Sequence, residues 1–268
     1  MKTKRTLVLI LLVISVSASA QSIYLRGGLG IAICTAPHMI YQSTTGSGES
    51  EPTIESKRGG LGTGMPFLVA AGYNLSDNFA VELGVDYFLG FNTKCVNTDG
   101  SYSGTIKNSG SMLALVPAFV MKFDLDKFKP YARLGIKVGV WNTAKTKETE
   151  TGPDEDLNRI SKDYGGIAIG AQAAAGVEYA LSDLLSLFGE INLDGISYAP
   201  TKGKFTKLTN NGVNELSNMT TKEKTWLYVK NLDESQSIPD SDPDKETKVN
   251  YSFANVGLIV GVKINLGK

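Results

Sequence analysis

The chain has 268 residues, of which 42% are hydrophobic and 20% are charged, and its 27 basic residues balance its 27 acidic residues. This neutrality excludes the whole-chain basic field that nucleic-acid-binding proteins use, so we expect no nucleic-acid partner. One histidine and two cysteines exclude most histidine-based catalysis, zinc clusters and dense disulfide scaffolds. We therefore expect no catalytic residue, no metal and no cofactor.

Residues 1–20 have the layout of a secretory signal peptide. Basic residues at positions 2–5 precede an apolar run over residues 6–16, and small residues at 17–20 predict cleavage between Ala20 and Gln21. The apolar run is too short for a membrane-spanning helix, and no later run is long enough. A membrane role for residues 21–268 would therefore depend on β-strands.

Alternation of apolar and polar residues recurs through residues 21–268, and this period of two is typical of strands. It is clearest near the end, where every even position from Ala254 to Leu266 is apolar. Pro66 interrupts the second such segment, which indicates a bulge or an edge position there. The predicted strands cover residues 23–33, 61–73, 79–90, 111–123, 131–141, 166–179, 185–194 and 254–266.

Short and long connections between these predicted strands alternate strictly. Two of the short ones share a sequence, because Leu75-Ser76-Asp77 recurs as Leu181-Ser182-Asp183. The alternation places all short turns at one end with both termini, and all long, polar loops at the other. The short turns are residues 74–78, 124–130 and 180–184, and the long loops are about 35–60, 92–109, 142–164 and 199–249.

The charges on the polar faces distinguish a membrane barrel from a soluble one. A soluble barrel has its apolar faces inside, whereas a transmembrane barrel has them outside against lipid. A soluble surface would carry about a quarter to a third charged residues, but these polar faces carry few, divided equally between acids and bases. We therefore predict an all-β fold, a single eight-stranded antiparallel up-and-down transmembrane β-barrel. An ion network would fill its lumen, formed by Arg26, Glu82, Asp86, Lys122, Arg133, Lys137, Glu178, Glu190, Asp194 and Lys263.

Aromatic residues gather near the ends of the predicted strands, as in the interfacial girdles of membrane barrels. One set lies near the short turns and the other near the long loops. The first set is Tyr73, Phe79, Phe123 and Tyr179, and the second is Tyr87, Phe91, Trp141, Tyr198, Tyr251 and Phe253.

Three strand–turn units carry a resemblance to a known family. They are residues 71–77 (Ala-Gly-Tyr-Asn-Leu-Ser-Asp), residues 129–135 (Lys-Pro-Tyr-Ala-Arg-Leu-Gly) and residues 176–183 (Gly-Val-Glu-Tyr-Ala-Leu-Ser-Asp). Over residues 21–268 the chain resembles the small OmpA/OmpX-like β-barrel proteins of bacterial outer membranes. The resemblance implies insertion in a Gram-negative outer membrane. It does not imply one activity, because the family includes structural, adhesive and channel members.

A few residues could carry chemistry. His38, with Ser43 and Glu49, could form the set of a lipid-modifying enzyme, but all three lie in a Thr/Ser/Gly-rich stretch, whereas such a set needs contact on rigid supports. We interpret His38 as a solvated loop residue. Cys34 and Cys95 both lie at the long-loop end, and the chain would pass an oxidising periplasm, so we hypothesise a disulfide between them.

The fourth long loop has clusters of both charges. Its lysines are at 202, 204 and 207, and an acidic cluster spans residues 240–244 without the regular spacing of an EF-hand calcium site. Residues 205–208 and 225–229 between them could form a hairpin above the barrel or two further wall strands. We prefer eight wall strands, because neither piece has a long uncharged apolar face.

These patterns favour a monomeric, non-enzymatic outer-membrane protein with a structural or surface-interaction role. Its expected partners are outer-membrane lipid and an extracellular ligand or host surface that contacts the long loops. The alternatives are a narrow pore or transport protein, a lipid-modifying enzyme, and a soluble secreted ligand-binding barrel.

Overall fold

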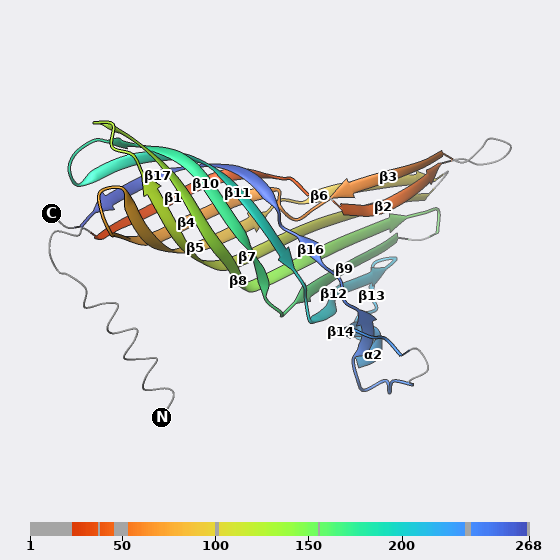
Figure 1. The fold of residues 1–268 in the computed structure, drawn as a ribbon. Helices are drawn as coiled ribbons and strands as arrows, with labels where there is room; N and C mark the ends of the chain where they lie inside the picture. Colours follow the sequence, from red (N-terminus) through yellow and green to blue (C-terminus); the bar gives the residue numbers. More distant parts are fainter. Residues whose placement is uncertain are drawn as a thin grey trace, which may run out of the picture.

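The computed structural model describes residues 23–36, 38–45, 53–99, 102–154, 156–233 and 237–266. The predicted signal peptide and its cleavage site at Ala20 and Gln21 lie outside these residues. The main feature is a closed antiparallel barrel of eight strands, which confirms the predicted fold class (Figure 1). The helix of the described part of the chain, α2 (Thr221–Lys224), is far too short to cross a bilayer.

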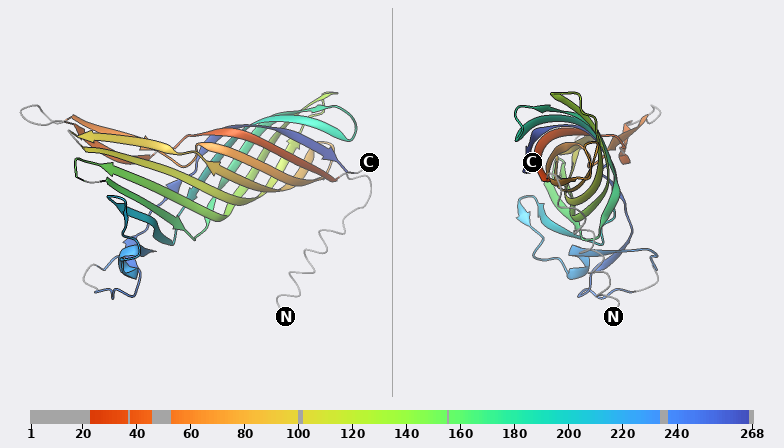
Figure 2. Two further views of the ribbon diagram at one scale, coloured as in Figure 1. Left: turned by 180° about the vertical axis from the view of Figure 1, so that it is seen from behind. Right: turned by 60° about the vertical axis from the view of Figure 1, so that its left-hand side comes forward.

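The barrel wall pairs each strand with its neighbours, and its last strand closes on its first. The closing ladder runs from Tyr24 opposite Asn265 to Cys34 opposite Asn255. The end-on view in Figure 2 shows the resulting ring. The wall strands, in order around the barrel, are β1 (Ile23–Cys34), β4 (Gly64–Asn74), β5 (Phe79–Gly90), β7 (Tyr102–Lys122), β8 (Phe128–Thr151), β10 (Ala168–Ala180), β11 (Leu185–Tyr198) and β17 (Asn255–Asn265).

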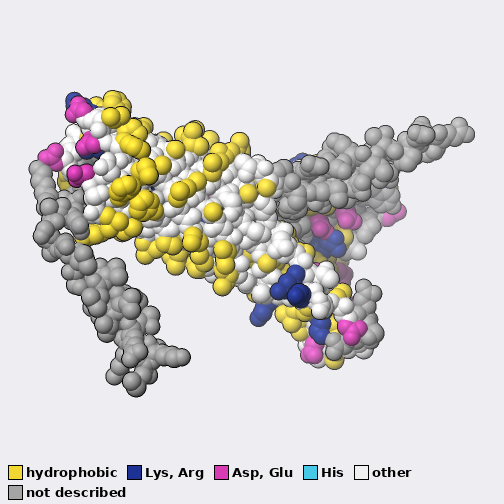
Figure 3. Space-filling view, viewed as in Figure 1, with side chains coloured by type: hydrophobic (Ala, Val, Ile, Leu, Met, Phe, Trp, Pro, Cys, Tyr) yellow, Lys and Arg dark blue, Asp and Glu magenta, His cyan; other side chains and the backbone are white. Residues whose placement is uncertain are grey.

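The faces of the wall follow the predicted alternation. Along β5 every second residue from Ala80 to Phe88 is buried, and the residues between them are exposed. The exposed positions are almost all apolar, so a belt of apolar side chains surrounds the barrel (Figure 3). In water such a belt would be costly, at about 25 cal/mol for each Å² of apolar surface, whereas lipid removes this cost. The apolar faces therefore point outward and the polar faces into the lumen.

The two related tripeptides form the same turn. The backbone amides of Leu75 and Ser76 both donate to the carbonyl of Phe79, at 2.8 and 3.1 Å. Leu181 and Ser182 donate in the same way to the carbonyl of Leu185, at 2.9 and 3.0 Å. The start of β1 and the end of β17 also lie at this short-turn end, as predicted.

Pro66 lies inside the wall and not at an edge. It is opposite Phe88 on β5, but the ladder between β4 and β1 is interrupted, since its pairs pass from Leu29–Phe67 directly to Ala32–Gly64. Proline has no N–H to donate, so the barrel tolerates it where one ladder is open.

The structure differs from the sequence-based prediction in the long loops, which are largely β-strands. β7 and β8 continue well beyond the barrel, most of the shorter strands extend their sheet, and β2 and β3 pair as a separate two-stranded sheet (Figure 1). Most of these segments lack a regular apolar face, so a search for apolar alternation suggests strands only at 205–208 and 225–229. The added strands are β2 (His38–Thr45), β3 (Thr53–Gly59), β6 (Thr93–Asp99), β9 (Asp156–Tyr164), β12 (Lys202–Asn210), β13 (Val213–Asn214), β14 (Thr225–Val229), β15 (Asp244–Thr247) and β16 (Tyr251–Ser252).

The apolar belt allows a matched test of membrane insertion. Leu134 in the wall and Leu125 in a short turn are almost equally exposed, at 65% and 64%. We expect Leu134→Arg to lower the free energy of unfolding by about 2–4 kcal/mol, and Leu125→Arg by about 0–1 kcal/mol, because the cost of a charge in lipid depends on depth. Urea unfolding in lipid vesicles measures both values. Equal losses in the two variants would contradict the assignment of the outward face to lipid.

Candidate functional site

The lumen is filled by successive layers of side chains. Strand β11 crosses all of them, since its inward residues Ser186, Phe188, Glu190, Asp194 and Tyr198 follow one another from the short-turn end to the opposite end. Two residues of strand advance the chain by about 6.6 Å, so the layers are about one side chain thick.

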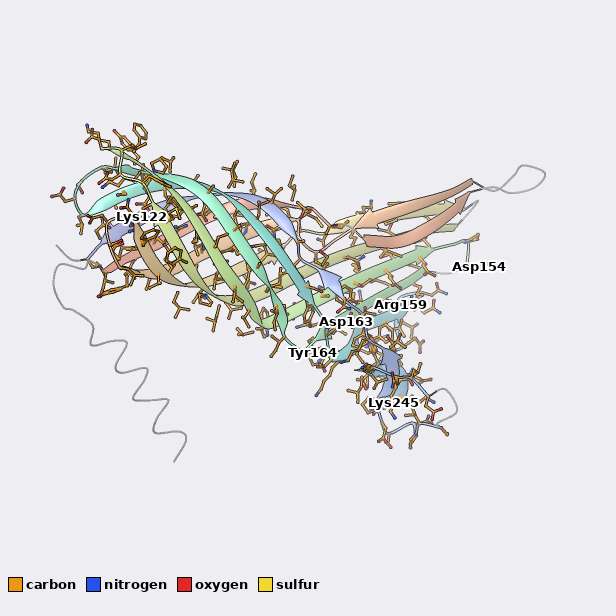
Figure 4. The ribbon with its side chains drawn as sticks, viewed as in Figure 1. Lys122, Asp154, Arg159, Asp163, Tyr164 and Lys245 are labelled. Atoms are coloured by element: carbon orange, nitrogen blue, oxygen red, sulfur yellow. The ribbon has the colours of Figure 1, made fainter. Side chains whose placement is uncertain are left out.

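The first layer lies at the short-turn end. Lys263 of β17 forms an ion pair with Glu178 of β10 at 2.7 Å, and its Nζ lies 4.2 Å from the centre of the Tyr24 ring. Lys122 of β7, labelled in Figure 4, donates a hydrogen bond to the side chain of Asn74. A Cβ at Gly72 would overlap the Tyr24 ring, so glycine is required there. These charges line a cavity of about 610 Å³ that opens between the short turns.

Glu190 is the centre of the second layer. Its carboxylate is fully buried and accepts from Arg26 at 2.5 Å, from Arg133 at 2.7 Å and from the Tyr131 hydroxyl at 2.7 Å. Glu82 lies beside the two guanidinium groups, at 3.6 Å from Arg26 and 4.0 Å from Arg133. One side chain therefore connects β1, β8 and β11 across the lumen.

The third layer is organised by Gln172. Its amide nitrogen donates to Asp86 at 2.9 Å and to Asp194 at 3.0 Å, and its amide oxygen accepts from Arg133 at 2.8 Å. Lys137 bridges the same two carboxylates, at 3.0 Å from Asp86 and 2.7 Å from Asp194. The glutamine thus joins the second and third layers into one network.

All the residues assigned to the lumen from the sequence lie on inward faces, and the structure places them in these three layers. The sequence reasoning missed Gln172, Tyr24 and Tyr131 as members of the network. Each lies on the same inward face as a charged residue of its own strand, an even number of positions away. This alternation was the signal available to find them.

Above the charged layers an apolar plug closes the lumen at the end away from the short turns. Phe88 and Met112 reach it from the wall, and Leu61 and Phe253 reach it from the segments that precede β4 and β17. The rings of Phe88 and Phe253 meet edge to face, with their centres 6.1 Å apart. The plug and the ion layers leave the cavity at the short turns closed at its inner end.

The aromatic girdle predicted near the long loops is only partly confirmed. Tyr87, Phe91 and Trp141 are exposed on the outer face, but Tyr198 and Phe253 are buried, at 0% and 1% exposure, in the plug. Tyr251 packs against the plug as well. Tyr198 has the same parity as Glu190 and Asp194, so its inward direction follows from the alternation of β11.

Beyond the plug, β9, β12, β14 and β15 extend the wall sheet from β8. On the sequence-based expectation that the long-loop end faces the medium, we call these strands, with β6 and the far parts of β7 and β8, the extracellular sheet. The segments at 205–208 and 225–229 form neighbouring strands above the barrel and add no wall strands, which is the hairpin alternative. Trp226 packs edge to face on Phe205, with ring centres 5.2 Å apart.

A buried carboxylate holds the base of the extracellular sheet together. Asp163 of β9, labelled in Figure 4, accepts hydrogen bonds from the hydroxyls of Tyr228 on β14, at 3.0 Å, and Tyr251 on β16, at 2.5 Å. Burial raises the pKa of the Asp163 carboxyl, although the two tyrosines favour its charged form. The same burial, with the nearby Asp163 charge, raises the pKa of both tyrosines.

The structure does not bring His38 and Ser43, two of the residues considered for a lipid-modifying enzyme, together. His38 and Ser43 lie in β2, where their backbones pair with Gly59 and Glu55 of β3. Five residues of strand separate them by about 16 Å along the chain. Glu49, the third member, lies outside the described residues.

The hypothesised disulfide is absent from the structure, in which Cys34 and Cys95 are both free thiols. Cys34 ends β1 opposite Asn255 of β17. Cys95 lies in β6, which pairs with the far part of β7, so it is opposite Ile106 beyond the barrel. The two cysteines therefore lie on strands that do not pair with each other.

The sequence matches the outer membrane protein beta-barrel domain family over residues 6–221. The chain belongs to this family. No curated protein matches the sequence. The family membership agrees with the closed barrel and its apolar belt, and it assigns the protein to the bacterial outer membrane.

Three solved structures are similar to this one at low identity. Neisserial surface protein A is 12% identical, with 93% of this chain and 99% of that chain covered and a TM-score of 0.35. Ail, the attachment invasion locus protein of Yersinia pestis, is 10% identical, with 92% and 97% covered and a TM-score of 0.34. The toluene transporter TbuX of Ralstonia pickettii is 8% identical, with 93% and 90% covered and a TM-score of 0.19.

Glu190 provides a test of the lumen network. Glu190→Gln leaves Arg26 and Arg133 without their shared carboxylate, and breaking a buried ion pair from one side costs about 3–5 kcal/mol. The matched variant is Glu148→Gln in the extracellular sheet, whose pairing with the partly exposed Arg159 contributes about 0–1 kcal/mol. Urea unfolding of the two variants in vesicles compares the losses. A loss below 1 kcal/mol for Glu190→Gln would show that the network does not stabilise the barrel.

Asp163 predicts a pH dependence of the extracellular sheet. Because its folded pKa is raised above the ordinary 3.8, the folded state binds the proton at a higher pH than the unfolded state. Stability is therefore gained as the pH falls through the raised pKa, and it is lost as the pH rises. Glu246, whose pKa burial also raises, acts in the same direction.

Hydrogen exchange of β9, β14 and β16, corrected for the intrinsic effect of pH, measures this dependence. We expect the free energy of opening to increase from pH 7 toward pH 4, with a smaller slope in Asp163→Asn. An identical slope in wild type and variant would assign the effect to other groups.

Proposed function

We propose that this protein is a monomeric, non-enzymatic outer-membrane barrel that acts in envelope structure or surface interaction through its extracellular sheet. The observation that carries the proposal is the contrast between a filled lumen and a wall that continues far outside the membrane. Strand β8 has 24 residues, whereas about 9–11 are enough to cross a bilayer. About half of the strand therefore presents a regular surface beyond the lipid.

The filled lumen argues against the narrow pore that was the first alternative. The ion pairs around Glu190 are fully buried, and the plug around Phe253 closes the end of the lumen away from the short turns. Opening a path would require the separation of buried charges from their partners, which costs several kcal/mol for each ion. The lumen therefore serves as a rigid support.

The strand position of His38 argues against the second alternative, a lipid-modifying enzyme. A nucleophile and its base must lie within hydrogen-bond reach, and the backbones of His38 and Ser43 are separated by several strand residues. We expect His38→Ala to leave the lipid composition of the membrane unchanged, as lipid mass spectrometry would show. A lost acyl-chain modification would reverse this conclusion.

Planar bilayer recordings test whether the lumen conducts. We expect no stepwise conductance from the wild-type protein, because the ion layers and the plug both block the lumen. Leu125→Arg, which changes only an exposed short turn, is the matched control and should behave alike. Stable ohmic steps in the wild-type protein would favour the pore instead.

Adhesion of bacteria that carry the barrel tests the surface role. Replacement of residues 202–249 by a short glycine–serine linker removes β12, β13, β14 and β15 and leaves every wall strand intact. We expect attachment to matrix-coated surfaces to fall to the level of cells without the barrel, while heat-modifiable migration shows that the barrel still folds. Unchanged attachment would contradict a role for this part of the sheet.

A further inference from the structure

The two faces of the extracellular sheet differ in charge. Residues directly opposite one another in neighbouring strands share a face, so the registers assign every position. The inward face carries Glu148, Arg159 and Asp163, in continuation of the lumen. The outward face continues the lipid-facing side of the wall through Trp141, Thr143 and the residues beyond them.

Lysine recurs on this outward face in five neighbouring strands, β6, β7, β8, β9 and β12. Among the strand positions that the structure describes there, the one acidic residue is Asp156, at the far end of β9. The lysines are Lys94 of β6, Lys107 of β7, Lys145 and Lys147 of β8, Lys162 of β9, and Lys202, Lys204 and Lys207 of β12. Figure 3 shows dark blue side chains gathered directly beyond the apolar belt.

The lysines are aligned in rows across the strands. One row places Lys145 opposite Lys162, and Lys162 opposite Lys204. Like charges directly opposite one another destabilise a sheet. In the part of the chain that the structure describes, no carboxylate forms an ion pair with Lys145 or Lys162. The row therefore has excess positive charge that an anion would neutralise.

A hollow of about 260 Å³ lies on this face between β7, β8, β9 and β12. Its charged groups are Lys145 and Lys162, the opposed pair of the row. Hydroxyl groups complete its lining, because the register bulge of β12 brings Thr206 to the same hollow. The hollow is lined by Ser109, Gly110, Ser111, Thr143, Lys145, Lys162 and Thr206. Two ammonium groups and several hydroxyls are the donors that a phosphate group needs.

The position of the hollow determines what could occupy it. Lys145 follows the exposed Trp141 by four residues of β8, about 13 Å along the strand. Trp141 lies at the upper limit of the apolar belt, where aromatic side chains of membrane barrels meet the headgroups. The hollow therefore faces sideways at the level of the headgroups and not upward into the medium.

We propose that this hollow, with the lysines around it, binds phosphate groups on the headgroups of outer-leaflet lipid. This site is separate from the proposed surface role, because it faces the surrounding bilayer. Basic residues near an anionic membrane surface each contribute favourably to lipid association, and the opposed pair adds charge-assisted hydrogen bonds. A bound phosphate would also remove the repulsion between Lys145 and Lys162.

Native mass spectrometry of lipid retention tests the site. The protein is released from phosphatidylcholine nanodiscs that contain either phosphorylated lipid A or its dephosphorylated form. We expect wild type to retain phosphorylated lipid A, and Lys145→Gln/Lys162→Gln to retain at least about tenfold less. The matched control, Lys222→Gln/Lys224→Gln, makes the same charge change on α2 outside this face and should retain as much as wild type.

Three results would overturn the proposal. The first is that the Lys145/Lys162 variant retains as much phosphorylated lipid A as wild type. The second is that wild type retains the dephosphorylated form as well as the phosphorylated form. The third is displacement of the lipid by inorganic phosphate or heparin, which would indicate a site for soluble anions. Heat-modifiable migration of every variant confirms folding before the measurement. The lipid-retention experiment measures neither adhesion nor conductance. A negative result would therefore count against this lipid site and not against the proposed function.

Discussion

The closing ladder between β1 and β17 is the constraint on which the rest of the structure depends. Inside a bilayer every backbone N–H and C=O needs a partner within the protein, and an open sheet would leave two edges unpaired. Closure of eight strands provides these partners, and it also determines how little space remains inside. The ladder from Tyr24 to Cys34 thus determines both the lipid-facing surface and the narrow lumen.

A narrow lumen strongly limits the side chains it can hold. The carboxylate of Glu190 binds groups from β1 and β8, and the amide of Gln172 binds groups from β5, β8 and β11. These contacts leave few buried charges far from an opposite charge. Acids and bases are therefore needed in nearly equal numbers, which is the physical basis of the balance in the sequence. The network and the plug around Phe253 make the barrel a rigid support for strands outside the membrane.

The two faces of the barrel wall continue into the extracellular sheet, but their side chains differ from those of the wall. Its inward face continues the buried lumen, with Asp163 held by tyrosines from two further strands. Its outward face exchanges aliphatic side chains for lysines at the height where lipid gives way to headgroups. The same alternation of strand positions thus separates interior from membrane in the barrel, and interior from headgroups above it.

The sequence by itself determined the wall. Its period of two, the repeated Leu-Ser-Asp turn and the charges confined to one face were enough to predict the closed barrel, its orientation toward lipid and the residues of the lumen. These features depend on neighbours in the chain. Tertiary structure alone decided which charges pair, that Tyr198 and Phe253 form a plug, that Cys34 and Cys95 are free thiols, and that polar segments continue as strands, because each depends on register between segments distant in sequence.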